Sequence, residues 1–234
     1  MIFQSSRLLS LHYMRVLIVS ATALEAKGII EPEVNLSDLK PGSVLHLNSK
    51  ADLLISGVGQ AITAYHLGLQ LLQQPYELAV NIGICGSFNR DIPLGTIVRV
   101  SSDSFFDLGA EDDNVWLSAF HMGLISKDEF PFRNGLLIPP GSGYFTEYQK
   151  VKGITVNRVT GSEVSVKKIM QFCDADVESM EGAAFLYACM QHEVPSVQLR
   201  AVSNYIEKRN RETWNIELAL SNISNVLTGF LNDI

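Results

Sequence analysis

Short apolar runs that alternate with segments of helical periodicity constrain the fold of this chain more than any other feature. Buried strands are predicted at 16–19, 53–56, 78–84, 96–100, 153–159 and 196–203, and helices at 62–72, 163–172, 178–191 and 214–231. The first long helix carries Ile62, Tyr65, Leu69 and Leu72 at helical spacing. Strands that are apolar along their whole length and separated by helices are typical of an α/β domain with a mostly parallel sheet.

Length and composition point to a single globular domain. The 234 residues suit one large domain. The content of 47% hydrophobic and 18% charged residues argues against intrinsic disorder and against a coiled-coil rod. We expect a ragged extension at residues 1–13 and one domain at residues 14–234, because Met14 begins a natural first strand. No apolar run reaches the roughly 20 residues that span a bilayer, so no membrane association is expected. Cys85, Cys173 and Cys189 form no CxxC pair, which fits a reducing cytoplasm.

Charge and motif spacing argue against several classes of partner and cofactor. The net charge of −7, without a long basic cluster, disfavours nucleic acid as a partner. The five histidines are dispersed and no HExxH motif occurs, so no metal site is expected. Ile62 stands where a GxGxxG motif that begins at Gly57 and Gly59 needs its last glycine. A dinucleotide cofactor is therefore not expected either.

Small and polar residues stand at the predicted carboxyl ends of the strands, where open α/β sheets bind their ligands. These candidates are Glu25, Gly57, Gly59, Gly86, Val159, Thr160, Ser203 and Asn204, together with Glu181 in the predicted first turn of its helix. A glutamate at a helix start is also explained by the macrodipole, and a two-glycine turn is either structural or a cradle for a ribose or one phosphate. From the residues alone, the structural and the functional explanations of the glutamate and of the glycine turn both stay open.

Five segments, in order along the chain, resemble the purine nucleoside phosphorylase and methylthioadenosine nucleosidase superfamily. They are residues 21–25, residues 56–59, residues 81–86, residues 177–184 with Val194-Pro195, and residues 200–204. The resemblance runs from Arg15 to the C-terminus and is weakest at 105–150, while residues 203–214 resemble the futalosine hydrolases of menaquinone biosynthesis in particular. It implies a three-layer α/β/α sandwich around a central mixed, mostly parallel twisted sheet. It also implies a small nucleoside substrate, no cofactor, and a homodimer or higher homo-oligomer.

The resemblance assigns roles to individual side chains. Glu25 corresponds to the general base that activates water, Glu181 to the glutamate that binds ribose hydroxyls, and Met180 to the methionine that packs against the sugar. Asn204 stands where adenine-specific nucleosidases have a catalytic aspartate. Because an amide both donates and accepts, it can meet O6 of a 6-oxopurine and accept from a protonated N7, which favours hypoxanthine, the base of futalosine. Asn81 replaces an arginine of bacterial phosphorylases, which favours hydrolysis over phosphorolysis.

Futalosine also carries a carboxyphenyl ketone, so its pocket needs an aromatic wall and a cation. Candidates are Phe88, Phe105 and Phe106 for the wall, Arg209 or Arg211 for the carboxylate, and Val159 and Thr160 as neighbours of the base. A solvated loop before a helix explains the two arginines equally well. We expect a neighbouring subunit to contact the irregular stretch at 105–132. The alternatives are a methylthioadenosine or adenosylhomocysteine nucleosidase, a purine nucleoside phosphorylase, and a nucleoside-binding sensor without turnover.

Overall fold

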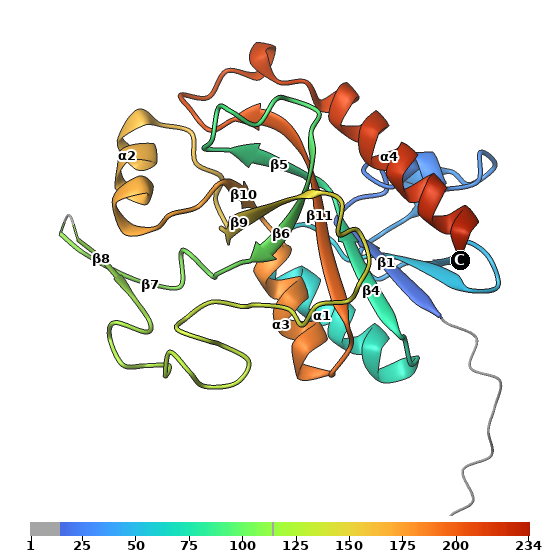
Figure 1. Ribbon diagram of the computed structural model, residues 1–234, viewed down its shortest axis with the longest axis horizontal. Coiled ribbons are helices and arrows are strands. Elements are labelled where there is room, and N and C mark those ends of the chain that lie inside the picture. Colours follow the sequence, from blue (N-terminus) through green and yellow to red (C-terminus); the bar gives the residue numbers. More distant parts are fainter. Residues whose placement is uncertain (1–14, 114) are drawn as a thin grey trace, which may run out of the picture.

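A mixed nine-stranded sheet forms the centre of the protein in a computed structural model, which describes residues 15–113 and 115–234 (Figure 1). The predicted extension at 1–13 and the proposed start at Met14 lie outside the described residues. The sheet strands are β1 (Val16–Ser20), β2 (Val44–His46), β3 (Ala51–Ile55), β4 (Leu78–Ile82), β5 (Ile84–Ser87), β6 (Ile97–Ser102), β9 (Gln149–Thr155), β10 (Val177–Ser179) and β11 (Ser196–Tyr205). Their order is β2-β3-β1-β4-β11-β5-β10-β9-β6, and β6 also pairs with β11.

Helices cover both faces of this sheet. They are α1 (Gln60–Gln73), α2 (Glu163–Phe172), α3 (Gly182–Gln191) and α4 (Ile216–Asp233), with short 3-10 helices at Lys27–Ile29, Leu36–Asp38 and Arg211–Thr213. On β1, Val16 and Ile18 belong to the core that includes α4, whereas Leu17 and Val19 belong to the core that includes α1 and α3. Figure 1 shows α4 on one side of the sheet and α1 with α3 on the other. A strand that is buried on both faces must be apolar throughout, which is why the sequence pattern revealed it.

Three predicted elements differ clearly from the structure at their ends. The predicted strand at 153–159 lies four residues earlier, as β9 at Gln149–Thr155, so Val159 and Thr160 follow the strand instead of ending it. The predicted helix at 178–191 begins later, because Val177–Ser179 is strand β10, which pairs with β5 and β9 and has three buried side chains. The predicted strand at 78–84 is divided at Gly83 into β4 and β5. In the last two places a short segment is compatible with more than one local conformation, and pairing with distant strands selects the observed one.

Helix α1 presents a different face to the core than its apolar spacing indicates. The side chains of Ile62, Tyr65, Leu69 and Leu72 are 40–73% exposed, whereas α1 buries Thr63, Leu67 and Leu71. The Thr63 hydroxyl donates to the Gly57 carbonyl oxygen at 3.0 Å, so this polar residue is satisfied inside the protein. The hydrogen bond places Thr63 on the inner face and leaves the apolar stripe outside.

The irregular stretch between β6 and β9 is partly anchored to the core by aromatic side chains. It contains a two-stranded hairpin of β7 (Gly109–Asp112) and β8 (Val115–Ser118), which stands away from the main sheet in Figure 1. Phe105 and Phe132 both contact Tyr187 of α3, with ring centroids 6.0 and 5.9 Å away. The stretch is therefore more than a solvated connection, because its aromatic residues extend the core on the α3 side.

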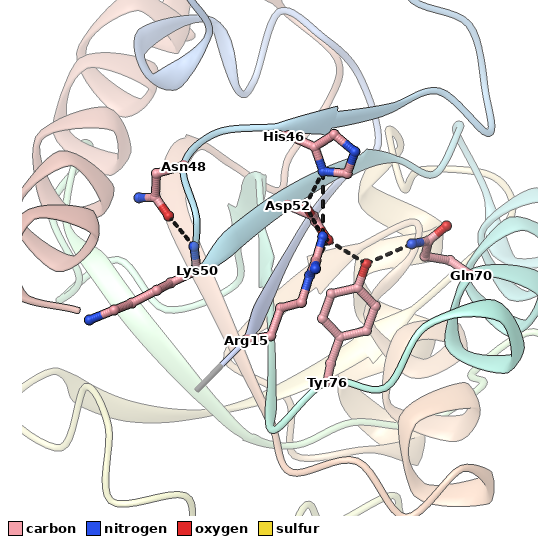
Figure 2. Close-up of polar contacts among 7 residues, drawn as sticks. All are labelled: Arg15, His46, Asn48, Lys50, Asp52, Gln70 and Tyr76. Atoms are coloured by element: carbon pink, nitrogen blue, oxygen red, sulfur yellow. Dashed lines mark hydrogen bonds and ion pairs between the residues drawn. The ribbon is translucent and has the colours of Figure 1, made fainter. Parts of the chain in front are cut away.

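A buried carboxylate joins three elements at the edge of the sheet opposite the carboxyl ends of β1 and β3 (Figure 2). Asp52 of β3 is 1% exposed and accepts hydrogen bonds from Arg15 Nε (2.9 Å), Arg15 Nη2 (3.1 Å) and the Tyr76 hydroxyl (2.8 Å). His46 Nδ1 lies 2.6 Å from the same side chain. Burial raises the pKa of Asp52, but the hydrogen bonds with His46, Tyr76 and Arg15 and the charge of Arg15 outweigh it and hold the pKa below its usual range. Asp52 therefore ties the start of β1 to β3 and to the end of α1.

We expect Asp52→Ala to lower the free energy of unfolding at pH 7 by about 3 kcal/mol, because it removes the shared acceptor of Arg15 and Tyr76. The lowered pKa means that the unfolded state binds this proton more readily than the folded state. The stabilisation by Asp52 is therefore complete above pH 4 and is lost as the pH falls through the folded-state pKa. Urea unfolding followed by circular dichroism measures both effects, with exposed Asp91→Ala as the control. Equal stability of the two variants at pH 7 would contradict this role.

Candidate active site

Turns at one edge of the sheet bring the predicted catalytic residues together. β3, β1 and β4 are parallel neighbours, and β11 runs parallel to β4. Glu25 follows β1, the Gly57 to Gly59 turn follows β3, and Gly83 follows β4. Carboxyl ends of parallel strands meet at one edge, so segments that are far apart in sequence form one site there.

Three donors hold the side chain of Glu25. Its Oε2 accepts hydrogen bonds from the Thr22 backbone N–H at 3.2 Å and the Thr22 hydroxyl at 2.9 Å. Its Oε1 accepts from the backbone N–H of Ile84 at 3.1 Å, across the strand end. The carboxyl group is half-buried and fixed in direction. Such a group is oriented to receive a proton at a defined position.

Glu181 connects the glycine turn after β3 with the beginning of α3. It is the residue immediately before α3, and its Oε1 accepts a hydrogen bond from the Gly59 N–H at 2.9 Å. Burial raises the pKa of Glu181, the positive charge of Arg200 opposes this rise, and the negative charge of Glu25 adds to it. The charges of Glu25 and Arg200 therefore both act on the Glu181 carboxyl group. Met180 lies half-buried between β10 and Glu181.

Arg200 is the functional candidate to which sequence reasoning assigned no role. It is 1% exposed on β11, and its Nη2 donates to Asn81 Oδ1 of β4. An ideal Cβ on Gly83 would lie 2.7 Å from Glu25 Oε1 and 3.3 Å from Arg200 Nη1, so the glycine leaves room for both side chains. A charged residue within the apolar strand at 196–203 was the signal that could have revealed it.

Asn204 lies at the other end of the site, near the end of β11. Strand β5 runs between β11 and β10. Its residue Gly86 is therefore paired with Asn204 of β11 on one side and with Glu178 of β10 on the other. Asn204 Oδ1 accepts from the Ser203 hydroxyl at 2.8 Å, and Asn204 Nδ2 donates to the Tyr205 carbonyl at 3.1 Å. An ideal Cβ on Gly86 would lie 3.2 Å from Asn204 Nδ2. The Asn204 amide therefore lies over Gly86, which has no side chain.

The predicted base neighbours border a cavity of about 520 Å³. Val159, Thr160 and Phe106 line it, and the ring of Phe106 stacks on Trp116 with centroids 6.2 Å apart. Phe105 is absent from the residues that line this cavity and instead packs against Phe132 and Tyr187. The cavity therefore joins the segment after β9 to the β7-β8 hairpin and α2.

The predicted cations of the 203–214 segment lie beside the same region. The Arg209 backbone N–H donates to the Gly161 carbonyl at 3.1 Å, and the Arg209 guanidinium lies 5.1 Å from the centre of the Trp214 ring. Arg211 lies 6.0 Å from that ring on the same loop. Phe88 packs against the small apolar cluster around Ile154. Both arginines are exposed.

Residues 15–113 and 115–234 show neither a metal-binding cluster nor a membrane-spanning helix. Within these two ranges there is no group of three or more histidine, cysteine, aspartate or glutamate side chains that could hold a metal ion. Among the helices of this described part, none combines the length and apolar character needed to cross a membrane.

Comparisons with known proteins agree with this geometry. The sequence profile described as Phosphorylase superfamily matches residues 146–232. The futalosine hydrolase of Streptomyces coelicolor is 29% identical over 223 residues, which are 92% of this chain and 94% of that protein.

Two solved structures share the fold. A 5′-methylthioadenosine/S-adenosylhomocysteine nucleosidase from Colwellia psychrerythraea, in complex with adenine, has a TM-score of 0.70 at 20% identity, with 92% of this chain and 93% of that chain covered. The futalosine hydrolase of Helicobacter pylori has a TM-score of 0.73 at 15% identity, with 95% and 99% covered. The sequence signatures, the sheet with its nucleosidase-type fold and these matches agree with one another. The chain is therefore similar to the phosphorylase superfamily over residues 146–232, to a futalosine hydrolase over most of its length, and to nucleosidases in its fold.

Proposed function

We propose that this protein hydrolyses the N-glycosidic bond of futalosine and releases hypoxanthine and dehypoxanthinylfutalosine. The observation that carries the proposal is the convergence of Glu25, Glu181 and Arg200 at one sheet edge, with the Asn204 amide further along β11, the strand of Arg200. Similarity to a futalosine hydrolase over 92% of the chain supports the same substrate.

The reaction requires water to replace the purine at the anomeric carbon. Cleavage of such a bond passes through an oxocarbenium-like ribosyl cation, so the nucleophile, the sugar and the departing base each need a partner. Glu25 removes a proton from water as the water oxygen bonds to the anomeric carbon. The electron pair of the glycosidic bond moves to the purine, which takes a proton from solvent on nitrogen, and Glu25 returns the proton of the attacking water to solvent. Atoms and charge balance without a cofactor.

Glu181 and Met180 hold the ribose in this mechanism. The Glu181 carboxyl group is tied by one oxygen to the Gly59 N–H, and its remaining lone pairs are available to ribose hydroxyl groups. Met180 precedes it and supplies an apolar contact for the sugar ring. Arg200 lies near Glu25 beside Gly83 and limits the repulsion between the two acidic residues, since its charge opposes the raised pKa of Glu181.

Asn204 contacts the departing purine. Its side chain is held by Ser203 and stands over Gly86, so its amide can face the O6 and N7 edge of hypoxanthine. An asparagine cannot deliver a proton as an aspartic acid does, which is why a 6-oxopurine fits this position better than adenine.

Water is a better nucleophile for this site than phosphate. Asn81 stands where bacterial phosphorylases have an arginine. It is a buried, neutral side chain that accepts a hydrogen bond from Arg200, so it offers no positive charge to a phosphate. Two carboxyl groups, from Glu25 and Glu181, would repel a dianion next to the anomeric carbon. Phe106 with Trp116 provides an aromatic wall at the cavity that Val159 and Thr160 also line. Arg209, whose backbone N–H donates to Gly161 of that cavity, provides a cation for the carboxyphenyl group.

The three-layer arrangement with a twisted sheet and the homo-oligomer are also part of this proposal. Helices on both sheet faces support the layers. The exposed apolar side chains of Ile62, Tyr65, Leu69 and Leu72 on α1 support contact with a second copy of the chain.

The decisive test is incubation of the purified protein with futalosine, aminodeoxyfutalosine, inosine and methylthioadenosine, with and without phosphate, followed by chromatography of the released base. We expect hypoxanthine from futalosine in phosphate-free buffer. Release of adenine alone would contradict the base assignment, and strict dependence on phosphate would contradict hydrolysis. Binding of futalosine without release of any base would favour the nucleoside sensor.

A further inference from the structure

Glu178 is a buried acidic residue to which the mechanism above gives no role. It lies on β10 and is 5% exposed. Its Oε1 accepts from the Thr160 backbone N–H at 2.8 Å, and its Oε2 accepts from the Thr160 hydroxyl at 2.6 Å. Within the described residues, no lysine, arginine or histidine forms an ion pair with Glu178. A carboxylate is costly to bury without a cation unless other donors satisfy it.

The sheet register places Glu178 and Asn204 on one face, on either side of Gly86. Gly86 pairs with Glu178 on one side and with Asn204 on the other, and directly paired residues point to the same face of a sheet. Neighbouring strands are about 4.8 Å apart, so the two backbones are separated by about 10 Å. Ile206 packs against Gly86 and makes the floor between them apolar. An apolar floor with a polar group at each end suits a flat heterocycle that is recognised at its edges.

We propose that Glu178 is the second residue that recognises the base, and that its carboxylate accepts the N1–H of hypoxanthine while Asn204 contacts the O6 and N7 edge. This inference rests on the proposed function and names the residue that selects its substrate. Thr160, which lines the adjoining cavity, holds the carboxylate in place and leaves its other lone pairs free.

The chemistry of the two purines explains the selection. Hypoxanthine carries a hydrogen on N1, whereas N1 of adenine is an unprotonated acceptor. An ionised glutamate only accepts hydrogen bonds. It therefore binds the N1–H of hypoxanthine and repels the N1 lone pair of adenine. Burial raises the pKa of Glu178 and the hydrogen bonds from Thr160 lower it. A buried, acceptor-only group therefore gains a donor when hypoxanthine binds and gains none from adenine.

The test compares Glu178→Gln with Glu163→Gln, which alters an exposed glutamate of α2. A glutamine amide can donate to N1 of adenine, so we expect the variant to lose about 10- to 100-fold in kcat/KM for futalosine. The kcat/KM for aminodeoxyfutalosine is expected to stay unchanged or rise. The ratio of the two values therefore falls at least about 10-fold in Glu178→Gln and stays constant in the control.

Binding of the free bases gives a second readout that does not need turnover. In isothermal titration calorimetry, Glu178→Gln is expected to weaken hypoxanthine relative to adenine. If this variant does not fold, Thr160→Val is expected to change the ratio in the same direction, because the carboxylate then loses the hydroxyl donor that fixes its direction. Equal losses on both substrates, or an unchanged ratio in a folded variant, would show a structural role only and overturn the inference. Wild-type protein that releases no hypoxanthine from futalosine would instead overturn the proposed function itself.

Discussion

Glu25→Gln is expected to lower kcat for futalosine by about 10³-fold, because it removes the group that takes the proton from water. Glutamine has nearly the same shape, and its carbonyl oxygen can still accept from the Ile84 N–H or from Thr22. The fold and the affinity for the nucleoside should therefore remain close to those of the wild type. Release of hypoxanthine in single-turnover assays measures the chemical step directly.

The matched control for this variant is Glu33→Gln, which changes an exposed glutamate of the same N-terminal segment. Calorimetry with futalosine should give similar dissociation constants for all three proteins. Retention of the wild-type rate in Glu25→Gln would exclude Glu25 as the base. Loss of binding together with turnover would show that Glu25 mainly positions the substrate.

Arg200→Met is expected to lower kcat/KM by about 10²-fold or more, because the two acidic residues then share the site without a cation. The charge of Arg200 opposes the raised pKa of Glu181, so its removal should raise this pKa further. The acidic limb of the pH–rate profile is therefore expected to move to higher pH. Steady-state kinetics across the acidic range measure both changes.

Two comparisons separate this electrostatic role from a structural one. Asn81 Oδ1 also loses its donor in Arg200→Met, and a buried group without a partner destabilises the fold. Arg200→Lys keeps the charge without the guanidinium fork and should leave the acidic limb nearly in place while the rate falls. Arg133→Met, at an exposed position, serves as the control. An acidic limb that does not move in folded Arg200→Met would contradict the coupling to Glu181.

The sheet strands were the most predictable part of the fold, and the inner face of α1 the least. The core strand β1 is apolar at Val16 through Val19 because both of its faces are covered. On α1, by contrast, Thr63 is buried and Leu72 is 73% exposed. The hydroxyl of Thr63 finds an acceptor at Gly57, a contact with the turn before the helix that hydropathy does not register.

Residues of the candidate site were predictable where they stand after a predicted strand or inside a sequence signature of the family. Glu25, Glu181 and Asn204 belong to this group, and their roles as catalytic residues remain proposals to be tested by the substitutions above. Arg200 stands within an apolar strand and Glu178 within the short strand β10, and where each lies relative to the other residues depends on strand pairings with distant parts of the chain. Phe105 was a candidate for the pocket wall, and the structure packs it against Phe132 and Tyr187.

By itself, the sequence determined the α/β class, the strand ends that carry the candidate residues, and the resemblance to nucleoside-cleaving enzymes. Those features depend on local apolar patterning and on residues at fixed positions along the chain. Only the tertiary structure decided that Arg200 lies with Glu25 beside Gly83 and that Glu178 and Asn204 pair with Gly86 from its two sides. The physical reason is that strand order and register bring these side chains together, and both arise from packing over the whole sheet rather than from neighbouring residues.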